Sequence, residues 1–126
     1  MEPLQAQKKI IILIEDDMRL RTIYMTVLDR AGFEIHPAPE ADLGLDLIKS
    51  LKWDILLLDI MLPVKDGISL LKTIEEEKLK KGKIVMLTNL NNENIIKDSF
   101  KYGADGYIIK ADVTPGTLVD EVKAFL

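Results

Sequence analysis

Short apolar runs recur along this chain, and each one ends at a polar residue. Residues 10–14 and 55–58 contain only Ile and Leu, and residues 84–87 add a run of Ile, Val, Met and Leu. Runs of this length and composition are typical of strands buried on both faces of a parallel sheet. Within residues 18–30, by contrast, apolar side chains recur at helical spacing. The chain is therefore expected to alternate between buried strands and amphipathic helices.

The alternation of strand and helix repeats five times. The expected strands are residues 10–14, 33–38, 55–58, 83–88 and 107–110. The expected helices are residues 18–30, 40–51, 68–81, 95–102 and 115–125. Pro37 indicates an edge strand, because proline cannot donate to a strand ladder. Parallel strands need right-handed crossovers, so this order predicts an α/β fold with helices on both faces of one parallel sheet.

Composition limits the kind of protein that this can be. The 126 residues suffice for one domain with a real core, and they include no cysteine for a disulfide framework or a thiolate metal site. The net charge of -4 does not favour binding to nucleic acid or to an anionic membrane. Residues 1–9 lack a signal-peptide layout, and the run 10–14 is too short to cross a bilayer. We expect a cytoplasmic protein with a flexible leader, residues 1–8, and one folded domain, residues 9–126.

Polar residues stand where four of the expected strands end. They are Glu15 and Asp16, Asp59, Thr88, and Lys110. Parallel topology brings these strand ends to one edge of the sheet, where open α/β folds bind their ligands. Crowded carboxylates favour a hard cation with oxygen ligands, and Mg2+ fits best because it needs few protein carboxylates. Thr88 and Lys110 then suit an incoming phosphoryl group, with Asp59 as its nucleophile.

Four blocks of the sequence resemble the receiver domain of two-component response regulators. They are residues 12–17, 57–67, 86–88 and 103–110, in the order that the family has them. The resemblance covers residues 9–126 and is to single-domain, chemotaxis-regulator-like members. It implies a flavodoxin-like fold, with five parallel strands in the order 2-1-3-4-5 flanked by five helices.

The resemblance also implies a role for each residue at the sheet edge. The implied roles are Asp59 as phosphoacceptor; Glu15, Asp16, Asp59 and the backbone carbonyl of Met61 as Mg2+ ligands; Thr88 and Lys110 as phosphoryl contacts; and Thr88 with Tyr107 as the switch. A histidine kinase or phosphotransfer protein would supply the phosphoryl group in a phosphorelay. The domain would catalyse only its own phosphorylation and dephosphorylation.

Phosphorylation would act by changing which partner the domain binds. The resemblance places the output surface on the fourth helix, the fifth strand and the fifth helix, for a downstream protein, an output domain or a phosphorylation-linked homodimer. Direct binding to nucleic acid or membrane is not expected. The last helix reaches Leu126, which fits either a stand-alone receiver or a receiver cut from a longer regulator.

Two positions depart from the family pattern. Ala111 follows Lys110 where receivers usually have a proline with a cis bond, so we expect a trans bond or a strained, mobile loop. Asn89 follows Thr88 where the family usually has a small residue. A larger side chain at the mouth of the cleft could slow the access of phosphodonors or alter dephosphorylation.

Three other functions fit parts of the sequence. A pseudo-receiver would keep the fold without phosphorylation, but the acid, hydroxyl and lysine set is complete. A Mg2+-dependent phosphatase of the haloacid-dehalogenase type would have an aspartate two residues after its nucleophile, where this chain has Met61. A flavodoxin-like cofactor binder would need a flavin phosphate loop, which is not recognisable. Asp17 and Asp66 are interpreted as helix caps rather than site residues.

Overall fold

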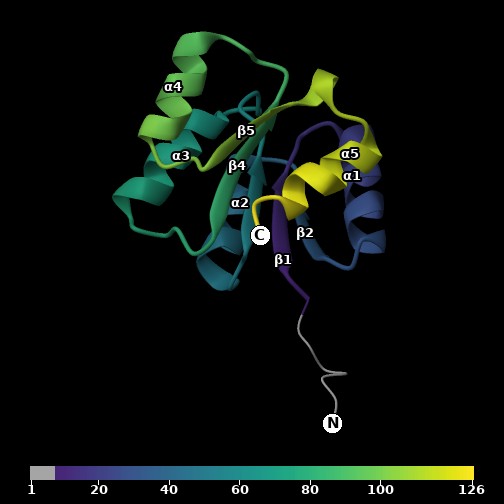
Figure 1. Ribbon diagram of the computed structural model, residues 1–126. Coiled ribbons are helices and arrows are strands. Elements are labelled where there is room, and N and C mark those ends of the chain that lie inside the picture. The colour runs from purple at the N-terminus through teal and green to yellow at the C-terminus, as the bar shows by residue number, and fades with distance from the viewer. Residues whose placement is uncertain (1–7) are drawn as a thin grey trace.

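One parallel sheet of five strands forms the centre of the molecule (Figure 1). The computed structural model describes residues 8–126. The strands are β1 (Ile10–Ile14), β2 (Glu34–Ala38), β3 (Ile55–Leu58), β4 (Lys83–Thr88) and β5 (Gly106–Ile109). They pair in the order β2-β1-β3-β4-β5, and every pair is parallel. The predicted fold class, strand order and edge position of Pro37 are confirmed.

Five α-helices cover the two faces of this sheet (Figure 1). They are α1 (Met18–Arg30), α2 (Ala41–Ser50), α3 (Gly67–Glu76), α4 (Glu93–Lys101) and α5 (Pro115–Lys123). Helices α1 and α5 pack on one face, where Tyr24, Leu28, Leu118 and Val122 are buried. Helices α2, α3 and α4 pack on the other face. The central strands β1 and β3 are thus buried on both sides, as their unbroken apolar runs predicted.

Side-chain caps fix the starts of the helices that follow the site loops. Asp17 Oδ1 accepts hydrogen bonds from two amides of the first turn of α1, and Asp66 Oδ1 accepts one from the amide of Ser69 in α3. Thr114 and Thr117 form a capping box ahead of Pro115 at the start of α5. These caps confirm the interpretation of Asp17 and Asp66, and they leave the neighbouring strand-end residues free for the site.

Several element boundaries differ from those expected, most by a residue or two, and the ends of α3 and β5 have structural consequences. Helix α3 ends at Glu76 instead of continuing to residue 81, and Lys78 adopts a left-handed conformation with φ of 55°. The following Lys81 points its ammonium group at the C-terminal end of α2, where it donates to three carbonyl oxygens at 2.7 to 3.0 Å. Strand β5 ends at Ile109, and Lys110 begins a short 3-10 helix, η2 (Lys110–Asp112). The predicted leader, residues 1–8, lies outside the described residues except for Lys8.

Candidate functional site

The carboxyl ends of four strands surround one shallow cleft. Glu15 and Asp16 follow β1, Asp59 follows β3, Thr88 ends β4 and Lys110 follows β5, and all five line this cleft. The strands β1, β3 and β4 are buried on both faces where they end at the cleft, and β5, ahead of Lys110, is partly buried. Rigid strands therefore place side chains from distant parts of the chain within reach of one another.

A buried ion-pair network joins three of these residues. Lys110 Nζ lies 2.7 Å from Asp59 Oδ2 and 2.5 Å from Glu15 Oε1. The side chains of Glu15 and Asp59 are almost fully buried, and that of Lys110 is 10% exposed. One ammonium group thus compensates two carboxylates that the fold has removed from water. Two carboxylates and one ammonium group leave a net negative charge in the cleft, and Asp16 adds a third carboxylate at its exposed rim.

The pKa shifts show how incomplete this compensation is. Burial raises the pKa of Glu15, and the ion pair with Lys110 and the hydrogen bond from the amide of Asp17 offset only part of that effect. Burial acts to lower the pKa of Lys110, but its hydrogen bonds and ion pairs with Asp59 and Glu15 outweigh burial and raise the pKa overall. The lysine therefore stays charged, whereas the buried glutamate carries an unrelieved cost.

The acidic residues fit a hard cation. Glu15, Asp16 and Asp59 each offer a carboxylate oxygen, and these oxygens lie within 4.8 Å of one another. Glu15 Oε1 is buried and accepts no well-aligned hydrogen bond within residues 8–126, although the ammonium group of Lys110 is close. A buried carboxylate oxygen whose neighbour is one ammonium group shared with Asp59 is the kind of ligand that a divalent cation can satisfy. The backbone amide of Met61 donates to Asp59 Oδ1 at 3.2 Å, and within residues 8–126 its carbonyl accepts no backbone hydrogen bond.

The hydroxyl side of the cleft is held by hydrogen bonds across loops. Thr88 is buried, and its Oγ1 accepts from the amide of Leu90 at 3.4 Å. The hydroxyl of Tyr107 donates to the carbonyl of Leu90 at 2.6 Å, with the ring half-buried against the core. Tyr107 does not line the cleft among the described residues, so it contacts the site through the loop that follows Thr88.

The two departures from the family pattern meet at the mouth of the cleft. Residues 8–126 contain no cis peptide bond, so the bond between Lys110 and Ala111 is trans, as one of the two expectations held. The side chain of Asn89 accepts a hydrogen bond from the amide of Ala111 at 2.8 Å. This contact was not predicted from the sequence.

Sequence reasoning also missed Arg21, in the second turn of α1. Its guanidinium group donates to the backbone carbonyls of Glu15 at 2.8 Å and Asp16 at 3.3 Å. These bonds fix the turn that carries both acids. The signal was available, because an arginine five or six residues after strand-end acids on a helix can reach back to their carbonyls.

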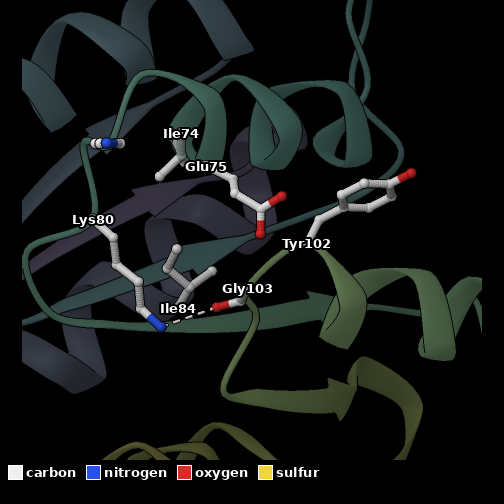
Figure 2. Close-up of a pocket in the computed structure, with 7 residues that line it drawn as sticks. Ile74, Glu75, Lys80, Ile84, Tyr102 and Gly103 are labelled. Atoms are coloured by element: carbon white, nitrogen blue, oxygen red, sulfur yellow. Dashed lines mark hydrogen bonds between the residues drawn. The ribbon is translucent and has the colours of Figure 1, made fainter.

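A second pocket lies at the opposite edge of the sheet (Figure 2). Ile74 and Ile84 form its apolar part, and Glu75 and Tyr102 stand at its rim. The ammonium group of Lys80 donates to the carbonyl of Gly103 at 3.1 Å. No set of convergent acids or hydroxyls like that of the cleft lines this pocket within residues 8–126, so the chemistry is expected at the carboxyl edge.

Comparison with known proteins gives the class of the chain. The family model of the response regulator receiver domain matches residues 11–123. The chain therefore belongs to the receiver domain family of two-component response regulators. The pseudo-receiver and phosphatase alternatives are not favoured. Within residues 8–126 no helix has the length and apolar character to cross a membrane.

Curated relatives agree with this family. The transcriptional regulatory protein SrrA of Staphylococcus aureus is 35% identical over 116 residues, which cover 92% of this chain and 47% of the relative. The chain thus spans about half the length of the curated relatives that it matches.

Solved structures agree as well. A CheY-like receiver domain protein of Methanospirillum hungatei JF-1 is 29% identical with a TM-score of 0.85, over 94% of this chain and 93% of that one. The BeF3-activated receiver domain of Klebsiella pneumoniae RstA is 31% identical with a TM-score of 0.83, over 93% and 97%. The chemotaxis protein CheY4 of Vibrio cholerae, at 22% identity and a TM-score of 0.88 over 95% and 100%, supports the fold alone.

Proposed function

We propose that this domain accepts a phosphoryl group on Asp59 and thereby switches its binding surface. The ion-pair network carries the proposal: Asp59 is buried at the end of β3 with one oxygen 2.7 Å from the ammonium group of Lys110. A carboxylate oxygen held rigidly beside a fixed positive charge is suited to attack phosphorus, since the ammonium offsets charge on the transferring group.

The transfer exchanges one bond to phosphorus for another. A carboxylate oxygen of Asp59 forms the new P–O bond while the bond to the donor breaks, and the leaving group keeps the electron pair. From a phosphohistidine of a kinase or phosphotransfer protein, the P–N bond breaks and the imidazole takes up a proton. Glu15, Asp16, Asp59 and the carbonyl of Met61 would hold Mg2+, which supplies charge neutralisation for the phosphoryl oxygens.

The switch is proposed to run from Thr88 to Tyr107. A phosphoryl group on Asp59 brings new acceptor oxygens to the cleft, and the Thr88 hydroxyl and Lys110 can donate to them. Movement of Thr88 would shift Leu90, whose backbone is hydrogen-bonded to the side chains of both Thr88 and Tyr107. The surface of α4, β5 and α5 would then change its preference for a downstream protein, an output domain or a second copy of the chain.

Intact mass after incubation with acetyl phosphate tests this proposal. We expect one phosphoryl adduct on the wild type in the presence of Mg2+, none after chelation of the metal, and none on Asp59→Asn. Circular dichroism of the variant serves as the control for folding. A folded wild type without an adduct, tried also with phosphoramidate, would contradict the proposal and favour a pseudo-receiver. Release of more than one equivalent of phosphate from a generic phosphate ester would favour a phosphatase.

A further inference from the structure

One hydrogen bond connects the two loops that carry the hydroxyl and the ammonium of the site. Asn89 Oδ1 accepts from the backbone amide of Ala111 at 2.8 Å, across 22 residues of sequence. Asn89 comes directly after Thr88, and Ala111 directly after Lys110. The bond therefore links the residue after Thr88 to the residue after Lys110, and so connects the loops that carry the hydroxyl and the ammonium group.

The bond depends on both partners. Ala111 lies in η2, and the first amides of such a helix have no acceptor within it. An asparagine side chain is a good acceptor at such an end. A proline at position 111 would have no N–H to offer, and a small side chain at position 89 could not reach it. Asn89 and Ala111 thus form a matched pair.

In the described part of the chain, the other hydrogen bonds of the loop that contains Asn89 do not involve Lys110 or η2. Leu90 is held by Thr88 and by Tyr107, on β4 and β5. Within residues 8–126, the hydrogen bond from the amide of Ala111 to Asn89 Oδ1 is the one that joins this loop to η2. Lys110 itself is anchored by its ion pairs to Glu15 and Asp59.

We propose that Asn89 is a positioning residue for phosphoryl transfer, whose side chain makes the Thr88 loop and the Lys110 loop respond to the phosphoryl group as one unit. The inference rests on the proposed phosphorylation of Asp59 and identifies Asn89 as a residue that sets its rate. When the phosphoryl group arrives, Thr88 and Lys110 must both pair with its oxygens. Two loops that are already joined lose less freedom in doing so than two independent loops.

The proposal predicts the opposite of a steric effect. If the bulk of Asn89 merely obstructed donors, Asn89→Ala would speed phosphorylation. If the hydrogen bond positions the loops, Asn89→Ala and Asn89→Leu both slow it, because both remove the acceptor although they differ in size. Loss of one such bond corresponds to a factor of roughly five in rate. Asn91→Ala, at an exposed asparagine of the same loop, is the matched control.

The experiment follows the rate of adduct formation from acetyl phosphate with Mg2+ by intact mass, in a double-mutant cycle of Asn89→Ala and Ala111→Pro. We expect each single variant to be slowed about fivefold, the double variant to be no slower than the slower single one, and Asn91→Ala to match the wild type. Unchanged or faster rates in Asn89→Ala, or purely additive effects, would overturn the inference, even if the thermal stability falls.

A direct readout covers the case in which Ala111→Pro does not fold. The amide of Ala111 should exchange its hydrogen roughly fivefold faster in Asn89→Ala than in the wild type, because its acceptor is gone. Unchanged exchange would overturn the inference. Failure of the proposed function looks different, since the wild type itself would then form no adduct on Asp59.

Discussion

Both edges of the sheet carry charged side chains, but within residues 8–126 those at the carboxyl edge are less well compensated than those at the amino edge. At the amino edge, Asp105 Oδ2 accepts from the amide of Ile84 at 2.9 Å and lies 2.9 Å from Lys80 Nζ. Burial acts to raise the pKa of Asp105, but these two partners lower it below its ordinary value. Lys81 is likewise satisfied by three carbonyls at the end of α2.

At the carboxyl edge the balance has the opposite sign. Three carboxylates gather there, and the one lysine pairs with two of them, Glu15 and Asp59. Burial raises the pKa of Glu15 overall. The contrast indicates that charges at the amino edge stabilise the fold, whereas the fold gives up stability at the carboxyl edge to hold a site. Loss of a lysine should therefore destabilise the protein at either edge, but only variants of the carboxyl edge should respond to metal, and only there should removal of a carboxylate increase stability.

The largest effect is expected from Lys110→Met. It removes the shared partner of two buried carboxylates, so the free energy of unfolding should fall by about 3 kcal/mol in the presence of EDTA. Urea unfolding with EDTA and with Mg2+ measures this loss and whether the cation reduces it. Lys97→Met is the control: its exposed ammonium lies 4.0 Å from Glu93, and the change should stay within about 0.5 kcal/mol. A loss below 1 kcal/mol in Lys110→Met would contradict the account, because it would mean that the buried carboxylates of Glu15 and Asp59 do not depend on Lys110 for charge compensation.

An intermediate effect is expected at the amino edge. Lys81→Met removes a cation that donates to three carbonyls of the end of α2, and should lower the free energy of unfolding by about 2 kcal/mol. The loss should be the same with and without Mg2+, since the edge has no part in the site. Lys52→Met, at an exposed lysine of the neighbouring loop, is the control and should be near neutral. A Mg2+-dependent loss in Lys81→Met would break the comparison between the edges.

The smallest effect should have the opposite sign. Glu15→Gln removes a costly buried charge, so the metal-free domain should gain about 1 kcal/mol at neutral pH, while stabilisation by Mg2+ is lost. Because the pKa of Glu15 is raised in the folded state, the wild type should gain stability as the pH falls through that pKa towards the ordinary value of 4.5. Thermal unfolding between neutral pH and pH 5 should show this gain in the wild type and not in Glu15→Gln. Destabilisation by Glu15→Gln at neutral pH would contradict the account.

Strong patterns in the sequence were enough to predict the fold and the residues that line the cleft. Apolar runs fixed β1 and β3, and parallel topology then implied that Glu15, Asp59 and Lys110 would meet. The end of α3 was missed because the charged run after Glu76 has high helix propensity, which a left-handed Lys78 overrides.

Contacts between loops could not be predicted from such patterns. The bond from Asn89 to Ala111 depends on the trans peptide after Lys110 and on the start of η2. Loop conformations of this kind are set by tertiary structure rather than by local sequence. Here the sequence showed that both positions were unusual, but not that they were partners.

The central claim is that the carboxyl edge exists to present Asp59 to a phosphoryl donor. Reduction of the phosphorylated protein with borohydride converts an acyl phosphate to an alcohol, so the modified aspartate becomes homoserine, which tandem mass spectrometry of the peptides can locate. The account predicts homoserine at position 59 alone, dependent on both the phosphodonor and Mg2+. Homoserine at position 16, the corresponding alcohol at Glu15, or no reduced residue in a protein that carries an adduct would contradict it.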